Sequence, residues 1–272
     1  MTLTQLTEQW LTQAGSHLRP RSVAAYRACL TDASQYITDL NGNLAVGITA
    51  WQSKRRAELA GASFALALTV IKSCLTWGKT AGHVTAPDCW SDLKPGKFEN
   101  ATFAIPTRKQ FDTIVAEIRR RDPECADFVD FLGAGGCRKS EAWALQWRDY
   151  DRDTGTLLIA RNGGKTGSRT LPRMERVCAV LDRLHRGEDA AFIFGKIEPK
   201  ARLDGACRRL GIPHVRTHDC RHFAAVQWLK AAGINRASIL ARYMGHSTEQ
   251  FLNRYSAHCT DAEYNEVAAL LK

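Results

Sequence analysis

The sequence lacks the features that mark several common protein classes. Its nine cysteines include no Cys-x-x-Cys pair, show no regular spacing and are odd in number, which favours reduced thiols in a cytosol over a disulfide framework. No run of 18 apolar residues occurs, and no basic segment followed by an apolar one opens the chain. These absences predict a soluble, cytoplasmic protein with no membrane span. Internal repeats and low-complexity tracts are also missing.

Acidic residues are outnumbered. The 272 residues include 38 lysines and arginines against 28 acidic residues, which gives a formal net charge of +10. A field of this sign attracts phosphate backbones regardless of their sequence, so a nucleic acid is the expected class of partner. A merely basic soluble protein is the alternative that charge alone leaves open. The length allows two small domains, each with its own core.

The first part of the chain has helical periodicity. Apolar stripes begin at Leu3 and Val23, a third helix is expected from about Ala50 to Leu59, and a more apolar fourth from Phe64 to Trp77. The periodicity breaks where Pro, Gly, Asn and Lys accumulate. We therefore expect a helical domain at 1–97, a linker at 98–105 and a second domain at 106–272. If the first domain clamps DNA, its candidate phosphate contacts are Arg19, Arg21, Lys54, Arg55, Lys72, Lys79, Lys94 and Lys97; otherwise these side chains are solvated helix surface.

The second domain opens with a capping box, Thr107 with Gln110 three residues later. Three glycines, Gly133, Gly135 and Gly136, are expected to allow a tight approach before a helix that starts near Arg138. The clearest β signal follows, from Thr156 to Leu171, with Asn162-Gly163-Gly164 as the hairpin connection. A small antiparallel sheet in a mainly α-helical chain is therefore predicted.

Chemistry-bearing residues gather between Thr217 and His258. Thr217 is the expected N-cap of a helix from about Asp219 to Ala232, which would place His218 and Arg221 on one face of its first turn. A Gly-His-Ser turn containing His246 should connect two further helices. Ser247 and Gln250 form a capping box for the last of these helices.

Tyr255 lies about two turns into that helix. A phenol with its ordinary pKa near 10 is a weak nucleophile, so it needs a base and an electrophile neutralised by cations. Arginine binds two phosphate oxygens and is always charged, which points to a phosphodiester as the electrophile.

The patterns H-x-x-R, G-H-S and R-Y-x-x-H closely resemble the C-terminal signature of the tyrosine recombinase (phage integrase) family. Upstream, G-x-R-x-S-E resembles the family's first arginine motif, and G-K-T-x-x-R-x-L-P resembles the setting of its hairpin lysine. The resemblance implies a SAM-like four-helix core-binding domain followed by an integrase-type catalytic domain, in the compact, Xer-like two-domain form. No further domain before the bundle is evident in the sequence.

The resemblance also implies roles. Tyr255 would attack DNA to give a 3′-phosphotyrosyl linkage and a free 5′-hydroxyl, and His218 would serve as general base or proton relay. Glu141 would support the site. The catalytic set implied by the family's motifs is Arg138, Lys165, His218, Arg221, His246 and Tyr255.

These roles describe a site-specific DNA recombinase that needs no cofactor and no metal. Its expected partners are a double-stranded recombination site, further copies of itself in a tetramer on paired sites, and accessory DNA-bending proteins. It would act in the cytoplasm, at the nucleoid. The family's C-terminal helix often docks on a neighbouring protomer, and the sequence leaves docking in cis or in trans open.

Three alternatives are weighed against this interpretation. The first is a catalytically idle DNA-binding protein on the same fold, and the second a topoisomerase-like or nuclease activity that shares the first chemical step. The third is a zinc module, although its spacings match none of the usual finger patterns. Its ligands would come from His218, Cys220, His222, His258 and Cys259.

Overall fold

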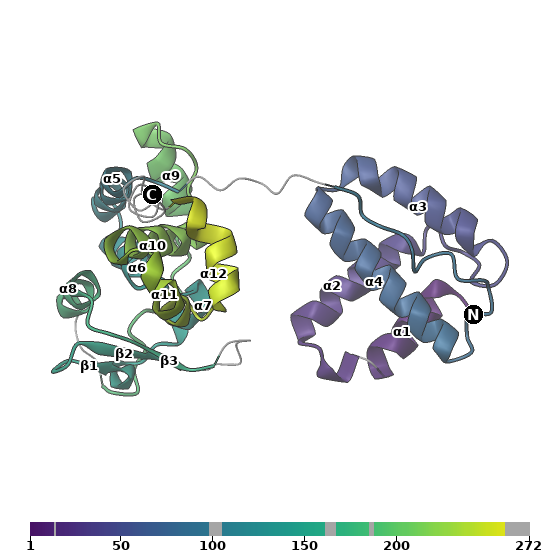
Figure 1. Ribbon diagram of the computed structural model, residues 1–272, viewed down its shortest axis with the longest axis horizontal. Coiled ribbons are helices and arrows are strands. Elements are labelled where there is room, and N and C mark those ends of the chain that lie inside the picture. The colour runs from purple at the N-terminus through teal and green to yellow at the C-terminus, as the bar shows by residue number, and fades with distance from the viewer. Residues whose placement is uncertain (14, 98–104, 161–166, 185–187, 259–272) are drawn as a thin grey trace, which may run out of the picture. The chain divides into compact units, whose positions relative to one another are not determined.

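The computed structural model describes residues 1–13, 15–97, 105–160, 167–184 and 188–258. The chain divides into two compact units, Met1–Thr102 and Phe103–Lys272. Figure 1 shows helices in both units and strands in the second. The prediction of a mainly α-helical chain with a small antiparallel sheet is confirmed.

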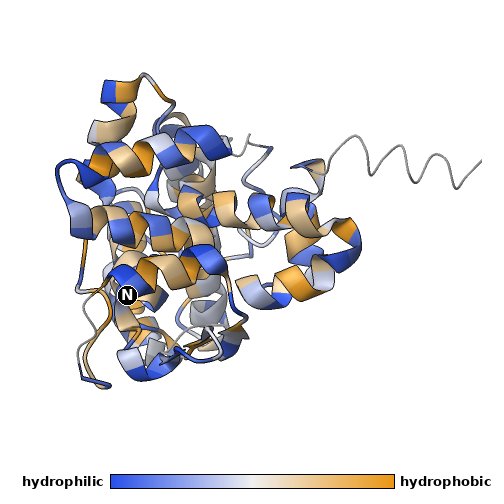
Figure 2. Ribbon diagram, turned by 90° about the vertical axis from the view of Figure 1, so that its left-hand side faces the viewer, coloured by the Kyte–Doolittle hydropathy of each residue, from blue (hydrophilic) through white to orange (hydrophobic). Residues whose placement is uncertain are grey.

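The first unit is a bundle of helices around an apolar core. Its elements are α1 (Leu3–Gln13), a 3-10 turn (Gly15–His17), α2 (Pro20–Ala33), α3 (Leu44–Glu58) and α4 (Gly61–Thr80). Hydrophilic and hydrophobic residues interleave along the helices (Figure 2), as expected where one face of each helix is buried. Trp51, Leu68 and Ile71 lie in this core. By length and composition alone α4 could cross a membrane, but its apolar face is what the bundle buries.

The third helix starts earlier than the sequence indicates. It begins at Leu44 rather than near Ala50. Leu44 and Ile48 are buried with Trp51 on the same side of the helix. The burial of these side chains in the bundle outweighs the weak local signal over the first turn.

The second unit contains the remaining helices. They are α5 (Arg108–Arg119), α6 (Pro123–Gly135), α7 (Lys139–Ala144), α8 (Glu175–Arg183), α9 (Lys200–Leu210), α10 (Thr217–Ala232), α11 (Ala237–Met244) and α12 (Thr248–Tyr255), with 3-10 turns at Trp147–Asp149, Ile234–Arg236 and Ser256–His258. The capping box of Thr107 and Gln110 is present at the start of α5. The buried α10 packs against α6 and also contacts α11 and α12 (Figure 1).

The glycines before α7 behave differently from one another. Gly133 and Gly135 belong to α6, and all three glycines precede α7, as expected. Gly133 allows a close approach, because a Cβ there would lie 2.2 Å from the Phe111 ring. Gly136 alone makes the turn, with φ of 61° as the left-handed C-cap of α6.

The strands form an antiparallel sheet in the order β1 (Tyr150–Asp151), β2 (Thr156–Ile159), β3 (Arg169–Leu171). Leu157 pairs with Leu171 and Ile159 with Arg169. The expected hairpin is therefore present as the β2–β3 pair. Its predicted Asn-Gly-Gly connection and Lys165 lie outside the described residues.

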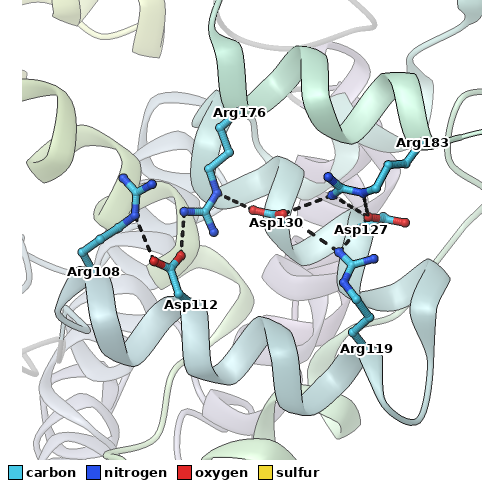
Figure 3. Close-up of polar contacts among 7 residues, drawn as sticks. All are labelled: Arg108, Asp112, Arg119, Asp127, Asp130, Arg176 and Arg183. Carbon is cyan, nitrogen blue, oxygen red and sulfur yellow. Dashed lines mark hydrogen bonds and ion pairs between the residues drawn. The ribbon is translucent and has the colours of Figure 1, made fainter.

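A network of ion pairs joins α5, α6 and α8 (Figure 3). Asp127 and Asp130, both on α6 and nearly buried, accept hydrogen bonds from guanidiniums of α5 and α8. Its members are Arg108, Asp112, Arg119, Asp127, Asp130, Arg176 and Arg183. We call this group the Asp127–Asp130 network. Because carboxylates and guanidiniums alternate in it, each charge has an opposite charge close by.

Candidate active site

The start of α10 positions the first pair of predicted site residues. The N-cap is Arg216, not Thr217, because the Asp219 carboxylate accepts hydrogen bonds from the Arg216 backbone N–H at 2.8 Å and from its guanidinium. The helix therefore begins two residues earlier than expected. Arg221 is buried, whereas His218 is exposed, and the two stand three positions apart on this first turn, as expected.

Arg221 is held by backbone carbonyls. Its guanidinium donates to the Gly136 carbonyl at 2.6 Å and to the Met244 carbonyl, so it joins the end of α6 to the end of α11. Burial and the neighbouring charge of Arg138 lower the pKa of Arg221 to about 10, which still leaves it charged at neutral pH. A buried guanidinium fixed in this way is a preorganised positive charge.

Glu141 is the carboxylate on which several guanidiniums converge. The Arg138 guanidinium donates to it at 2.8 Å, and Arg169 donates at 2.8 and 3.1 Å. Arg221 lies 3.9 Å away. Burial alone would raise the pKa of Glu141, but the hydrogen bonds and charge of Arg169 and the contacts with Arg138 lower it to about 2. We call these four residues the Glu141 cluster.

His246 lies in the tight connection between α11 and α12, as predicted. Gly245, with φ of 64°, ends α11, and the His246 backbone N–H donates to the Ala241 carbonyl at 2.9 Å. Nε2 of His246 lies 3.1 Å from an Arg221 nitrogen. Its Nδ1 is buried and has no hydrogen-bond partner within the described parts of the chain. Burial and the charge of Arg221 lower the pKa of His246 to about 4.

Tyr255 ends α12 and is fully buried. The capping box of Ser247 and Gln250 starts this helix as predicted. The Tyr255 ring lies nearly parallel to the His246 ring, with 6.5 Å between centroids. Its phenol oxygen lies 2.7 Å from Nδ1 of His222. Burial raises the pKa of Tyr255, so the phenol keeps its proton in this state.

Two predicted site residues remain, His218 and Lys165. Burial and the charge of Arg221 lower the pKa of His218, so His218 lies close to the guanidiniums of the site. His218, expected to serve the phenol, instead contacts the His222 ring edge-on at a centroid distance of 4.8 Å. Lys165 lies outside the described residues. Arg138, Arg221, His246 and Tyr255, which come from distant positions in the sequence, are brought together with Glu141.

A cleft of about 830 Å³ opens over the Glu141 cluster. Its described lining contains Arg138, Arg169, Arg242 and His246 and includes no carboxylate. The remaining lining comes from β2, β3 and the two residues before it, α11, the α11–α12 connection and α12. An anion that enters it would meet positive charge on several sides.

Sequence reasoning overlooked three residues of this region. His222 was considered only as a zinc ligand, although its spacing of four from His218 places the two on one side of α10. Arg169 belongs to the quoted hairpin motif but was given no role. Arg242 offered no pattern that would have singled it out.

The candidate DNA contacts of the first unit differ in their environments. Arg55 makes a bidentate pair with Asp32, and Lys72 donates to the carbonyls of Ser91 and Leu93. Other members of the set have internal contacts as well: Lys54 with Glu58 and Lys79 with the Ala86 carbonyl. The exposed members are Arg19, Arg21, Lys54, Lys79, Lys94 and Lys97. Their role in DNA binding stays a prediction.

The structure also bears on the proposed zinc ligands. Among the described residues, no group of three or more His, Cys, Asp or Glu side chains is arranged to hold a metal ion. His222 instead contacts Tyr255. Cys259 lies outside the described residues, as does the predicted C-terminal helix.

Comparison with known proteins gives consistent matches. Tyrosine recombinase XerC of Xanthomonas campestris pv. campestris (strain B100) is 30% identical over 131 residues, 44% of this chain and 39% of the relative. The chain thus aligns with about two fifths of the length of this relative. The Tn1549 transposon integrase in complex with a circular intermediate DNA has a TM-score of 0.79 at 16% identity, with 99% of each chain covered. A lambda integrase dimer bound to a COC′ core site has a TM-score of 0.76 at 14% identity, over 92% of this chain and 95% of that one.

These structural likenesses show the fold of both units. The phage integrase family matches residues 107–261, a stretch that is more than half of the chain and includes the Glu141 cluster, His246 and Tyr255. The chain therefore belongs to the phage integrase family.

Proposed function

We propose that this protein is a site-specific DNA recombinase that cleaves and rejoins DNA through a 3′-phosphotyrosyl intermediate. The observation that carries the proposal is the convergence of Arg138, Arg169 and Arg221 on the single carboxylate of Glu141, beside a buried tyrosine. Among the residues that the structure describes, positive charge exceeds negative charge there, and the adjoining cleft adds Arg242. A phosphodiester supplies the missing negative charge.

The scissile phosphate would be gripped from two sides. Arg138, a third exposed at its side chain, and the buried Arg221 come from separate elements and would each donate to a non-bridging oxygen. Fixed donors of this kind stabilise the charge that develops on a pentacoordinate phosphorus without reorganising during the reaction. Glu141 holds the guanidiniums at a set spacing.

His246 would add a further donor. Because an Arg221 N–H points to Nε2 of His246, that nitrogen is the acceptor and the neutral ring carries its proton on Nδ1. A buried Nδ1–H without a partner among the described residues costs free energy. A phosphate oxygen at this position would satisfy it.

The reaction then follows from the geometry. The Tyr255 oxygen attacks phosphorus, the bond to the 5′ oxygen breaks, and that oxygen takes a proton, for which Lys165 is our candidate donor. The bond energy stays in the phosphotyrosine. A 5′-hydroxyl of a second strand reverses the step and rejoins DNA, so neither ATP nor a metal is required.

The partner would be a duplex recombination site. The solved relatives include integrases bound to DNA and a lambda integrase tetramer bound to a Holliday junction, which supports duplex DNA as substrate and a tetramer as the assembly. The first unit would clamp the duplex through its exposed basic residues. We further propose that accessory DNA-bending proteins assist, and that the protein acts on DNA in the cytoplasm, at the nucleoid.

A nicked half-site of the cognate DNA, sought next to the gene, tests the proposal. The wild-type chain should form a covalent adduct on a denaturing gel, Tyr255→Phe should form none while it still binds the duplex, and Tyr150→Phe in β1 should behave as wild type. An adduct with Tyr255→Phe would place the nucleophile elsewhere. Duplex binding with no wild-type adduct would favour an idle DNA-binding protein, and cleavage without joining a second duplex would favour a topoisomerase-like enzyme.

A further inference from the structure

Tyr255 has a partner that the motifs did not assign. Nδ1 of His222 lies 2.7 Å from the phenol oxygen, a normal length for a hydrogen bond between a hydroxyl and a nitrogen. Both residues are buried, with exposed fractions of 5% for His222 and 0% for Tyr255. An imidazole nitrogen therefore already lies within hydrogen-bond distance of the phenol oxygen before DNA is bound.

Two adjacent residues of α10 contact different parts of the site. Arg221 and His222 are adjacent on α10, yet Arg221 reaches the carbonyls of Gly136 and Met244 while His222 reaches α12. One side chain therefore serves the site of the phosphate and the next serves the nucleophile. His218, one turn earlier, touches the edge of the His222 ring and is itself exposed.

We propose that His222 is the group that accepts the phenolic proton when Tyr255 attacks and returns it when the strand is rejoined. The inference rests on the proposed function and names a residue outside the set assigned from the motifs.

The step balances within the site. The Tyr255 O–H bond breaks, its proton passes to Nδ1 of His222, the O–P bond forms and the 5′ oxygen leaves with a proton from a separate donor. His222 becomes an imidazolium for the lifetime of the covalent intermediate. On rejoining, the 5′-hydroxyl returns its proton to that separate donor and its oxygen forms a bond to phosphorus. The O–P bond to Tyr255 breaks, and the imidazolium reprotonates the phenolate.

The resting site keeps His222 neutral and ready to accept. Burial and the nearby His218 lower the pKa of His222 to about 4. The described titratable or charged groups that act on it are His218, Asp219 and Arg221 on α10, Arg254 and Tyr255 on α12, and His246 before α12. A phosphodiester anion beside Arg221 would partly cancel the surrounding positive charge and raise the basicity of His222 when DNA is seated.

Nuclear magnetic resonance of the full chain with ¹⁵N-labelled histidine tests the contact without DNA. His222 is identified as the resonance missing in His222→Asn. We expect the tautomer with the proton on Nε2 and an unprotonated Nδ1 that accepts from the phenol; the Nδ1 resonance should shift in Tyr255→Phe. A proton on Nδ1 would overturn the proposal, because His222 would then donate to the phenol and could not receive its proton.

Single-turnover cleavage of the half-site tests the role. Asn places an amide near the position of Nδ1, so His222→Asn preserves a hydrogen bond to the phenol but cannot take a proton. We expect it to cleave about a hundredfold or more slower, while folding, judged by thermal melting, and duplex binding persist. Cleavage by His222→Asn at the wild-type rate would reduce His222 to a positioning residue and defeat the proposal.

A matched variant and a modified substrate separate the proton transfers. In His218→Asn the loss should be smaller, because that residue does not touch the phenol; a larger loss than in His222→Asn would transfer the role to His218. Sulfur in place of the 5′ oxygen makes a leaving group that needs no acid. His222→Asn should still cleave this substrate slowly. Cleavage at the wild-type rate would instead show that His222 protonates the leaving group.

The dependence on pH gives the last readout. Wild-type cleavage should fall on the acid side as His222 becomes protonated, and His222→Asn should lose that fall. An unchanged acid limb in His222→Asn would contradict the proposal. Absence of any wild-type adduct would instead defeat the proposed function itself, so the two failures can be told apart.

Discussion

Two groups of arginines in the second unit use the same chemistry with different charge balance. In the Asp127–Asp130 network, guanidiniums alternate with the carboxylates of Asp112, Asp127 and Asp130 (Figure 3). In the Glu141 cluster, Arg138, Arg169 and Arg221 share one described carboxylate. The first group has four guanidiniums for three carboxylates and is nearly balanced, so it ties helices together. The second has three guanidiniums for one carboxylate and keeps binding capacity for an anion.

Backbone carbonyls stabilise the surplus of buried positive charge in the Glu141 cluster. Arg221 is anchored by carbonyls at the ends of α6 and α11, and Arg169 donates to the Tyr243 carbonyl at 2.7 Å. Carbonyl dipoles offset part of the desolvation without neutralising the charge. The site thus keeps its positive potential while its guanidinium donors remain partnered.

The two groups should differ most in the rate of half-site cleavage after one arginine of each is changed to lysine. In Arg221→Lys the paired carbonyl contacts and the planar fork are lost, and half-site cleavage should fall about a thousandfold. In Arg183→Lys, whose side chain belongs to the Asp127–Asp130 network and is 44% exposed, cleavage should stay near wild type. Equal losses in single-turnover assays would show that the two groups do not differ in function.

Removing one carboxylate from each group should affect stability. Glu141→Gln leaves several buried guanidiniums facing one another, and the free energy of unfolding should fall by roughly 3–5 kcal/mol. Asp130→Asn should cost less, about 1–3 kcal/mol, because Asp112 and Asp127 still balance its partners. Thermal unfolding with and without sulfate sharpens the test: the anion should restore Glu141→Gln more than Asp130→Asn. The same response in both would refute the surplus of positive charge.

As the pH falls, the stability contributed by two buried histidines should be lost before that contributed by either group of carboxylates. The pKa values of His222 and His246 are lowered from 6.5 to about 4 by burial and neighbouring positive charge. Between these values the unfolded chain takes up protons that the folded chain does not, so stability falls as pH drops from 6.5 towards 4. For His222 the loss at pH 5 is about 1–2 kcal/mol.

The carboxylates lose their contribution to stability at lower pH than the histidines do. The lowered pKa values of Glu141 and Asp127 contribute stability above their ordinary pKa values that is lost only as pH falls below them. Chemical denaturation of wild type and His222→Asn at pH 7 and pH 5 checks the histidine term. An equal pH dependence in both chains would contradict it.

The smallest effect concerns the rim of the cleft. Arg242 is exposed and lines the cleft, so Arg242→Ala should weaken DNA binding modestly and reduce the slope of log affinity against log salt by about one. Arg208→Ala, on the exposed side of α9, is the matched control and should leave the slope unchanged. Fluorescence anisotropy over a series of salt concentrations measures both. A larger change of this slope in Arg208→Ala than in Arg242→Ala would place the bound DNA over α9 instead of over the cleft.

Local signals in the sequence predicted local structure well. The capping boxes before α5 and α12 and the glycine that ends α11 are where the sequence places them, because each depends on residues within one turn. The sequence predicted Thr217 as the N-cap of α10, because threonine is a common capping residue. The N-cap is Arg216 instead, because its backbone N–H donates to the Asp219 carboxylate.

Contacts across the chain were predictable only where a family motif supplied them. The motifs brought Arg138, Arg221 and Tyr255 into one hypothesis, and the structure gathers them. The contact between His222 and Tyr255 spans 33 positions, and no periodicity reports such a distance. Arg169 joined Glu141 through the register of β3, which likewise depends on tertiary packing.

Gly136, at the junction of α6 and α7, limits how this protein can be redesigned. Its carbonyl fixes Arg221, Arg138 follows two positions later, and a Cβ on it would lie 2.8 Å from the Trp228 ring and 2.9 Å from the Met244 sulfur. The spacing of the two guanidiniums is therefore set by main chain that no rotamer can adjust. A chimera should carry this corner over intact, together with the tryptophan and methionine that surround it.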